Sequence, residues 1–461
     1  MISAALRYSS RAGASALSVV VATLLFLSFS YPAHAMKIQT IKSPGGIEAW
    51  LVEEHSVPLM ALRFVFEGGN SQDPAGKEGV ANFITAMMDE GAGDLKSQAY
   101  QELMEDISMR MGYEDSKDSM YGSFETLTVN RDKAVELLKL SVQKPRFDGD
   151  AADRIRQQLL ANISYADKDP DKVAGREWYA LAYQGHPYGH SPNGSKETVA
   201  KITSEDLKSF HKRTFAKNTL KVVAVGDIDA KQLGTLIDDV FGGLPEKADL
   251  LPVPKVEPVN GGKQSVIEMN VPQSVAVFGL GAMPRKDPDF MAAFVANHII
   301  GGGGFSAKLM EEVREKRGLA YSVYTYIQPY QHTSFLQGSV ATKNESMAES
   351  LAIIRNELKK MADNGPTPED LEAAKDYLTG SYALRFDTNS KIATQLLGLL
   401  QEGFGTDYVE QRNKIIEAIT LDDVKRVAKR LLNTDGLIVI VVGKPVGLKS
   451  ASPAASAPTK G

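Results

Sequence analysis

Ile202-Thr203-Ser204-Glu205-Asp206-Leu207 is a stretch whose pattern recurs later in this chain. It reappears 217 residues further on as Ile419-Thr420-Leu421-Asp422-Asp423-Val424. Each copy is followed by an apolar stretch that ends in glycine, Val222-Val223-Ala224-Val225-Gly226 and Ile438-Val439-Ile440-Val441-Val442-Gly443, again 217 residues apart. The pattern predicts a helix, capped in the first copy by Ser204, and then a buried strand. Because two matches at one spacing rarely arise by chance, we expect the chain to be a duplication.

A second pair of matching segments lies near the front of each half. Val80-Ala81-Asn82 resembles Val295-Ala296-Asn297, at an offset of 215 residues. Between the halves, residues 250–262 contain three prolines and a Gly-Gly pair, a composition typical of a semi-rigid linker. We therefore expect a first domain over residues 36–249 and a second over residues 263–447.

Each half mixes predicted strands and helices. In the first half, periodicity predicts strands over 62–67 and 121–129, and helices over 80–89, 97–111 and 150–167. In the second half it predicts strands over 274–281, 320–326 and 334–341, and helices over 287–300 and 306–316. This irregular mixture indicates an α+β fold, in which each half is a mainly antiparallel sheet packed with helices.

The amino terminus has the pattern of a signal peptide over residues 1–35. Arg7 and Arg11 precede an apolar run over 16–29, and Ala33-His34-Ala35 forms a small-x-small cleavage site. The run is shorter than the about 20 residues that a membrane-spanning helix needs. We expect cleavage after Ala35 and a periplasmic protein, with an uncleaved membrane anchor as the alternative.

Composition excludes several classes of protein. The 461 residues include no cysteine, which rules out disulfides, thiolate-bound metals and a catalytic cysteine. A net charge of -5, with acidic and basic residues mixed, argues against a nucleic-acid partner. Residues 448–461 are rich in Ala, Ser and Pro and predict a disordered tail.

Most common catalytic and metal-binding motifs are absent from the sequence. There is no G-x-S-x-G elbow, and the glycine run 301–304 lacks the Gly-Lys-Ser/Thr of a phosphate loop, so we expect it to end one helix and cap the next at Ser306. His186 and His190 have a helical ligand spacing, but Pro187 and Gly189 between them favour a loop whose imidazoles bond local backbone groups. His298 lies on an apolar helix face and is interpreted as a packed core residue.

One constellation does suggest chemistry, the stretch from Arg314 to Tyr321. Gly318 can end the helix that carries Arg314, and Tyr321 then begins a strand, so the two side chains could meet over one surface. A guanidinium and a phenol held together are good donors to a peptide carbonyl or an oxyanion. On spacing alone, the alternative is that Arg314 pairs with Glu311 on a solvated face while Tyr321 packs.

Three sets of residues resemble the pitrilysin/insulinase family of zinc metallopeptidases. They are Gly68-Gly69-Asn70, Asp73-Pro74, Lys77-Glu78-Gly79-Val80-Ala81 and Phe83; His186-Pro187-Tyr188-Gly189 with Gly194; and Arg314 with Tyr321 at the family's seven-residue step. The resemblance spans about Ile38 to Gly443 and implies a clam-like arrangement of the two halves around a peptide-binding chamber.

The zinc site of that family is not retained. Its inverted H-x-x-E-H motif should fall on residues 82–86, where Asn82 and Ala86 replace both histidines and Thr85 replaces the general-base glutamate. The third ligand, a glutamate, is replaced by Asn162. Neutral amides bind zinc poorly, and threonine cannot activate a water as a carboxylate does. We therefore expect no cofactor on this chain and no peptidase activity from it alone.

Arg314 and Tyr321, by contrast, are retained where the family uses such a pair to bind the substrate backbone and stabilise the tetrahedral intermediate. The resemblance thus implies a non-zinc subunit that acts on peptides or unfolded segments, with zinc on a paralogous H-x-x-E-H-bearing partner. One rival is a non-enzymatic peptide-binding or scaffold protein of the same fold. Another is a self-sufficient peptidase that uses unusual ligands such as Asp89, Glu90, His186 or His190.

Overall fold

The computed structural model describes residues 36–449. The predicted signal peptide and residues 450–461 of the predicted tail lie outside the described residues. No helix within residues 36–449 is both long and apolar enough to cross a membrane.

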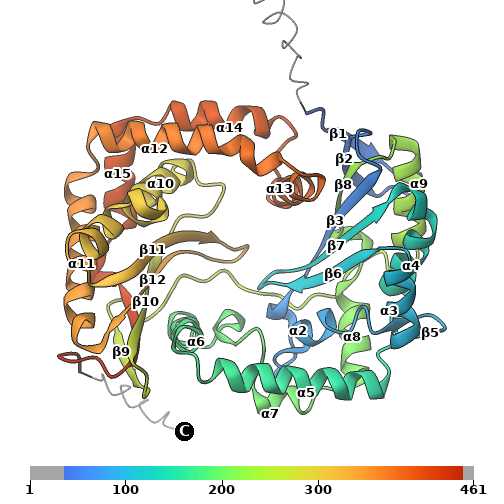
Figure 1. The fold of residues 1–461 in the computed structure, drawn as a ribbon, viewed down its shortest axis with the longest axis horizontal. Helices are drawn as coiled ribbons and strands as arrows, with labels where there is room; N and C mark the ends of the chain where they lie inside the picture. Colours follow the sequence, from blue (N-terminus) through green and yellow to red (C-terminus); the bar gives the residue numbers. More distant parts are fainter. Residues whose placement is uncertain (1–35, 450–461) are drawn as a thin grey trace, which may run out of the picture. The chain divides into compact units, whose positions relative to one another are not determined.

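The first half contains a six-stranded sheet with the order β1-β2-β8-β3-β7-β6 (Figure 1). Its strands are β1 (Gln39–Lys42), β2 (Glu48–Glu53), β3 (Leu59–Glu67), β6 (Arg110–Asp115), β7 (Ser119–Leu127) and β8 (Lys221–Gly226). Only β2 and β8 pair in parallel, and all other neighbours are antiparallel. A separate two-stranded ribbon joins β4 (Gly91–Ala92) to β5 (Leu95–Lys96).

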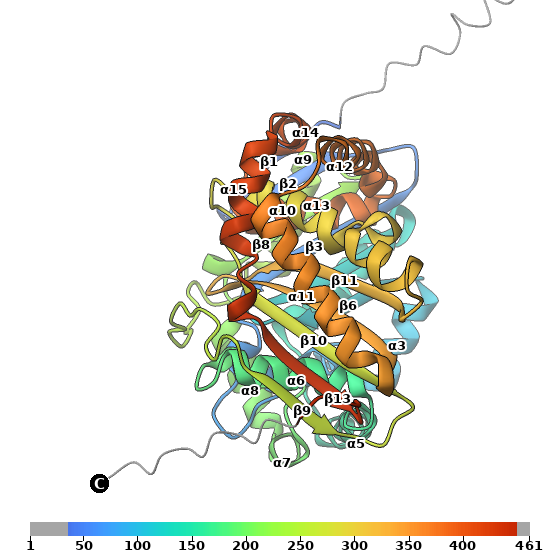
Figure 2. The same ribbon diagram turned by 90° about the vertical axis from the view of Figure 1, so that its left-hand side faces the viewer.

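The second half repeats this topology. Its strands are β9 (Gln264–Glu268), β10 (Gln273–Gly281), β11 (Ala320–Pro329), β12 (Ser334–Lys343) and β13 (Ile438–Gly443). They are ordered β9-β13-β10-β12-β11, and β9, β13 and β10 run side by side in Figure 2. Again one pair is parallel, β9 with β13, which corresponds to β2 with β8. Strand for strand, the sheet matches β2-β8-β3-β7-β6, which confirms the predicted duplication and the α+β class.

The two repeated helices begin with the same capping box. The helix α8 (Ser204–Thr214) is capped by Thr203, whose hydroxyl accepts from the backbone N–H of Asp206 while the Asp206 side chain accepts from that of Thr203. The helix α15 (Leu421–Leu431) is capped in the same way by Thr420 and Asp423. The prediction of Ser204 as the cap was wrong by one residue, because only the threonine has a carboxylate three positions later.

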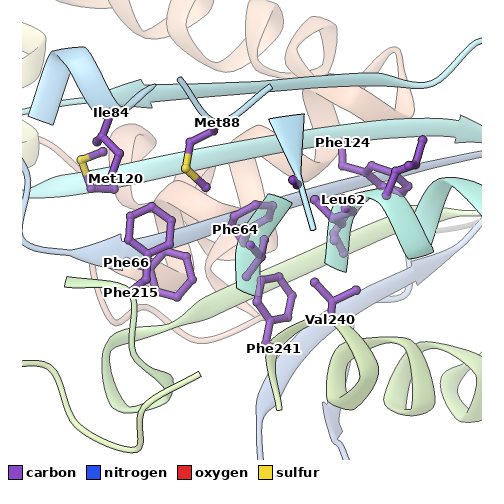
Figure 3. Close-up of a cluster of buried hydrophobic side chains, with 14 of the residues drawn as sticks. Leu62, Phe64, Phe66, Ile84, Met88, Met120, Phe124, Phe215, Val240 and Phe241 are labelled. Atoms are coloured by element: carbon purple, nitrogen blue, oxygen red, sulfur yellow. The ribbon is translucent and has the colours of Figure 1, made fainter. Parts of the chain in front are cut away.

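Helices cover the sheets and help build three clusters of buried hydrophobic residues, one in each half and a third on the opposite face of the second sheet. Those of the first half are α2 (Val80–Thr85), α3 (Ser97–Asp106), α4 (Arg131–Gln143), α5 (Gly149–Ala166), α6 (Pro170–Ala182), α7 (Lys196–Val199), α8 and α9 (Ala230–Phe241). Those of the second half are α10 (Phe290–Asn297), α11 (Met347–Asn364), α12 (Pro368–Gly380), α13 (Asn389–Gln401), α14 (Tyr408–Glu417) and α15. Figure 3 shows the aromatic centre of the first core, where the rings of Phe64 and Phe241 lie 5.1 Å apart.

Two predicted helices of the first half are shorter than expected. The segment predicted as helical over 80–89 is helical only over α2, and the one predicted over 97–111 ends at Asp106 in α3. The second helix stops because Ser108 adopts φ +52°, after which residues 110–115 pair with β7 as β6. Tertiary pairing has here overridden a helical periodicity.

Each half also contributes a helix to the other half's sheet. The helix α6 packs against β10 and β13, and α13 packs against β3 and β8 (Figure 1). Trp178 of α6 is fully buried beside Phe335, with 5.1 Å between ring centroids. Gly279 of β10 makes this approach possible, because a Cβ there would lie 2.4 Å from the indole. Both faces of each sheet are therefore covered, and the halves are interlocked.

Candidate functional site

Arg314 and Tyr321, which the sequence places near each other, are in contact. Cζ of Arg314 lies 5.0 Å from the ring centroid of Tyr321 and 4.5 Å from that of Phe305. The guanidinium is thus stacked between two rings, and both are open to solvent, 80% exposed for Tyr321 and 63% for Phe305. Each such contact stabilises a cation by about 0.5–1 kcal/mol at an exposed site. Phe305 was missed by the sequence reasoning, although it directly follows the glycine run.

The turn between Arg314 and Tyr321 brings them together. Gly318 adopts φ +62°, its N–H donates to the Arg314 carbonyl at 2.8 Å, and the chain then enters β11. A bulge lies between Ala320 and Val323, both buried, and Tyr321 within it is exposed. Bulges re-aim side chains at the edge of a sheet, and β11 is such an edge strand.

The glycine run 301–304 brings Phe305 to the site. A Cβ on Gly301 would lie 2.3 Å from the hydroxyl of Thr325 on β11, so only glycine lets the backbone pass this closely. Gly304 then adopts φ +59°, which turns the chain toward Phe305. The run is therefore structural and lies directly behind the site.

Ser306 does not cap the following helix as predicted. Its hydroxyl donates to the carbonyl of Gly303 at 2.9 Å instead of accepting a backbone N–H of the helix. The helix over the predicted segment 306–316 is π-helical across Met310–Glu315, the part that carries Arg314. Single π-turns of this kind are frequent at functional sites.

The acidic neighbours of Arg314 are neutralised by other residues. Glu311 pairs with Lys316 at 2.8 Å, and Glu312 pairs with Lys316 and Arg317, both at 2.6 Å. Hydrogen bonds from Lys316 and Arg317 lower the pKa of Glu312 to about 2. The Arg314 guanidinium makes no ion pair or hydrogen bond within the described residues, so the alternative pairing with Glu311 does not occur. Its N–H donors are free to bind a ligand.

The former metal positions in the first half form a different kind of network. Asn82 on α2 donates its amide to Asp115 at 3.2 Å, and Asn70 donates to the same carboxylate at 2.8 Å. The Thr85 hydroxyl donates to the Asn82 carbonyl at 2.8 Å. Burial raises the pKa of Asp115, and hydrogen bonds from the two amides oppose that rise. Where the family holds a metal, this chain has an amide–carboxylate tie between α2 and β6.

The remaining positions supply no ligand either. Ala86 ends α2 without a donor atom, and Asn162 is exposed on α5. Throughout residues 36–449, no cluster of three or more His, Cys, Asp or Glu side chains could hold a metal ion. A zinc ion therefore does not fit this chain's own residues.

Two of the four unusual ligands of the self-sufficient alternative, Glu90 and His186, are engaged with other groups. Glu90 accepts from Arg154 at 3.1 Å and also from Ser97. The His186 ring bonds the Pro254 carbonyl at 3.0 Å and accepts the Tyr188 N–H at 3.1 Å. As predicted, the loop imidazole at 186 satisfies backbone groups.

Comparison with known families matches both halves. Residues 50–194 match "Insulinase (Peptidase family M16)", and residues 201–378 match "Peptidase M16 inactive domain". The two matched segments run from β2 in the first half to α12 in the second.

Curated relatives of the chain include a protein named as a non-peptidase homolog and proteins named as uncharacterized zinc proteases. The non-peptidase homolog YmxG of Helicobacter pylori is 25% identical over 390 residues, covering 85% of this chain and 90% of that protein. An uncharacterized zinc protease of Mycobacterium tuberculosis is 26% identical over 410 residues, covering 87% and 92%. A crystal structure of a peptidase M16 inactive domain from Pseudomonas fluorescens superposes with a TM-score of 0.84 at 30% identity, covering 90% of this chain and all of that one.

Proposed function

Since the chain belongs to the insulinase family, peptidase family M16, we propose that it is the non-zinc subunit of a two-chain zinc peptidase. The observation that carries the proposal is the contrast between the halves. The first half has an amide–carboxylate tie where the family has its metal, while the second presents Arg314 with unused donors beside an exposed Tyr321.

The proposed role of the pair is to bind a peptide backbone and the oxyanion that forms from its carbonyl. The two aromatic faces around Arg314 restrict rotation of its guanidinium plane and leave the N–H groups at its edge available. The Tyr321 hydroxyl supplies a second donor from the neighbouring strand. Donors held ready before the reaction stabilise developing charge without reorganisation, and losing one typically lowers turnover by about 10²- to 10³-fold.

The partner would supply the rest of the chemistry. Zinc, when bound by an H-x-x-E-H-bearing paralogue, activates a water for attack on the peptide carbonyl. This chain offers no base at the corresponding place, because the Thr85 hydroxyl is engaged with a backbone carbonyl. Export by the predicted signal peptide would bring both chains together in the periplasm.

A scaffold or peptide-binding role without catalysis is the second candidate. The likeness to a protein described as a non-peptidase homolog supports it. In that case the chain would bind peptides alone and would not change the activity of a zinc-bearing paralogue.

Reconstitution distinguishes the two candidates. The chain is co-expressed with a zinc-bearing paralogue from the same genome, and cleavage of unfolded polypeptide is measured. Arg314→Ala and Tyr321→Phe should each reduce turnover by about 10²-fold while the two chains still co-purify. Lys343→Ala and Tyr324→Phe are the controls, because these side chains are exposed on the neighbouring strands β12 and β11 and should leave turnover unchanged. Equal activity of all four variants would refute the catalytic role.

A further inference from the structure

The second half contains a separate cavity with an unusual charge balance. It measures about 270 Å³ and lies among α10, α13, α14 and the 3-10 helix Ser381–Phe386. Three arginines line it, Arg285, Arg385 and Arg412, whereas Glu402 is the only acid among the described residues of its wall. Nothing in the proposed peptidase role accounts for this excess of positive charge.

The Arg285 guanidinium is paired and stacked with neighbouring side chains. Its Nε pairs with Glu402 at 2.9 Å, and its Nη2 donates to the Tyr408 hydroxyl at 2.8 Å. Its guanidinium also stacks on the rings of Phe290 and Phe404, at 4.7 and 4.6 Å from their centroids. This arginine and its carboxylate therefore form a structural unit, and within the described residues Glu402 pairs with neither of the other two arginines.

Arg412 is a buried cation without a carboxylate. The residue is only 6% exposed, and its Cζ lies 4.1 Å from the ring centroid of Tyr382. Its Nη1 donates to two neutral acceptors, the Leu378 carbonyl at 2.9 Å and the Asn413 amide oxygen at 3.0 Å. Its Nε and Nη2 make no hydrogen bond with the described residues. Burial lowers the pKa of Arg412, and so does the positive charge of Arg385.

Arg385 gives the cavity a charged and accessible rim. It is exposed and forms no ion pair within residues 36–449. Burying a cation is unfavourable unless an anion compensates it, and guanidinium groups bind planar oxyanions through paired N–H donors. We propose that this cavity binds a small organic oxyanion, held between Arg412 and Arg385.

The other walls define the body of the ligand. They include Phe294, Leu399 and Ile327, which are apolar, and the face of Tyr382. The volume lies just below the usual range of ligand sites, roughly 300–1,000 Å³, so the ligand should be small, with one aromatic or branched aliphatic group beside its acid. The carboxyl end of a peptide and a phosphate monoester share this chemistry, an oxyanion carried on an apolar body. The proposal does not rest on the peptidase role, since it needs neither zinc nor Arg314.

Calorimetric titration of the mature chain tests the site. N-acetylphenylalanine, its amide, phenyl phosphate and inorganic phosphate are compared at one ionic strength. We expect one or both organic anions to bind, the tighter one identifying the head group, and the amide to bind about 10- to 100-fold more weakly. Equal binding of acid and amide would overturn the proposal, and so would inorganic phosphate that binds as tightly as phenyl phosphate.

Variants locate the binding on these two arginines. Arg385→Gln changes an exposed residue and should weaken binding of the preferred anion by about 10-fold or more without affecting the fold. Arg412→Gln should weaken binding of the preferred anion to the same extent if the variant folds. If it does not fold, the comparison of the acid with its amide on the unaltered chain still tests the site. Arg110→Gln, an exposed arginine without an ion pair among the described residues, is the control for loss of one charge. Unchanged affinity in a folded Arg385→Gln would refute the proposed site.

Discussion

Trp178 is the largest side chain that the first half buries against the sheet of the second half, and Trp178→Ala tests this interlock. The indole is fully buried against Phe335, and its N–H has no acceptor in the described structure, so truncation removes packing alone. A buried tryptophan removes about 150–250 Å² from water, which at about 25 cal/mol per Å² gives roughly 4–6 kcal/mol as an upper value. Measured truncations of large aromatic core residues fall at about 3–5 kcal/mol. We expect a loss of about 4 kcal/mol.

Thermal unfolding followed by circular dichroism measures this loss. A loss of about 4 kcal/mol should lower the Tm of the second half by about 8–16 °C, although Trp178 belongs in sequence to the first half. Tyr165→Ala is the control, since that aromatic residue on α5 is 74% exposed. If Trp178→Ala and Tyr165→Ala have the same Tm, or if only the Tm of the first half falls, the interlock does not stabilise the second half.

Further predictions concern pH, the aromatic support and the repeated glycines. Burial lowers the pKa of His211 to about 4, so the folded state favours the neutral ring. This contribution to the free energy of unfolding is present above pH 6.5 and is lost as pH falls toward 4, by about 3 kcal/mol. In urea titrations at the two pH values, His211→Gln should therefore lose less stability on acidification than the unaltered chain. Phe305→Ala removes one ring from Arg314 and should lower turnover of the reconstituted pair by about 2- to 5-fold, whereas unchanged turnover would deny it a supporting role. Gly226→Ala places a Cβ 2.2 Å from a strand carbonyl and should destabilise more than Gly46→Ala, which shares a positive φ but has open space around it. Metal analysis of the purified chain should find no stoichiometric zinc, and stoichiometric zinc would contradict the conclusion that the first half has lost its metal site.

Local and repeated features of this fold could be predicted from the sequence. The 217-residue repeat predicts two sheets of one topology because β8 and β13 occupy the same place in each sheet. The contact of Arg314 with Tyr321 also follows from local geometry, since Gly318 supplies the turn and the step is only seven residues. Errors at this level were small, as with a cap assigned one residue too late.

Long-range features were not accessible in the same way. The periodicity of α6 indicates an apolar face but does not show which sheet that face covers. In the structure, Trp178 packs beside Gly279 of the second half's sheet. The excess of arginine at the cavity arises from residues spread between 285 and 412, which no spacing brings together. Asn82 reads as a lost ligand in the sequence, and only the structure reveals its bond to Asp115.

In the proposed two-chain peptidase, this chain supplies the hydrogen-bond donors and its partner supplies the zinc. The most direct measurement is the rate of peptide cleavage by the chain alone, by the zinc-bearing paralogue alone, and by the two together, with and without Arg314→Ala/Tyr321→Phe. We expect negligible cleavage by either chain alone, cleavage by the pair, and loss of at least about 10²-fold in the double variant. Full activity of the paralogue alone, or of the pair carrying the double variant, would contradict this expectation.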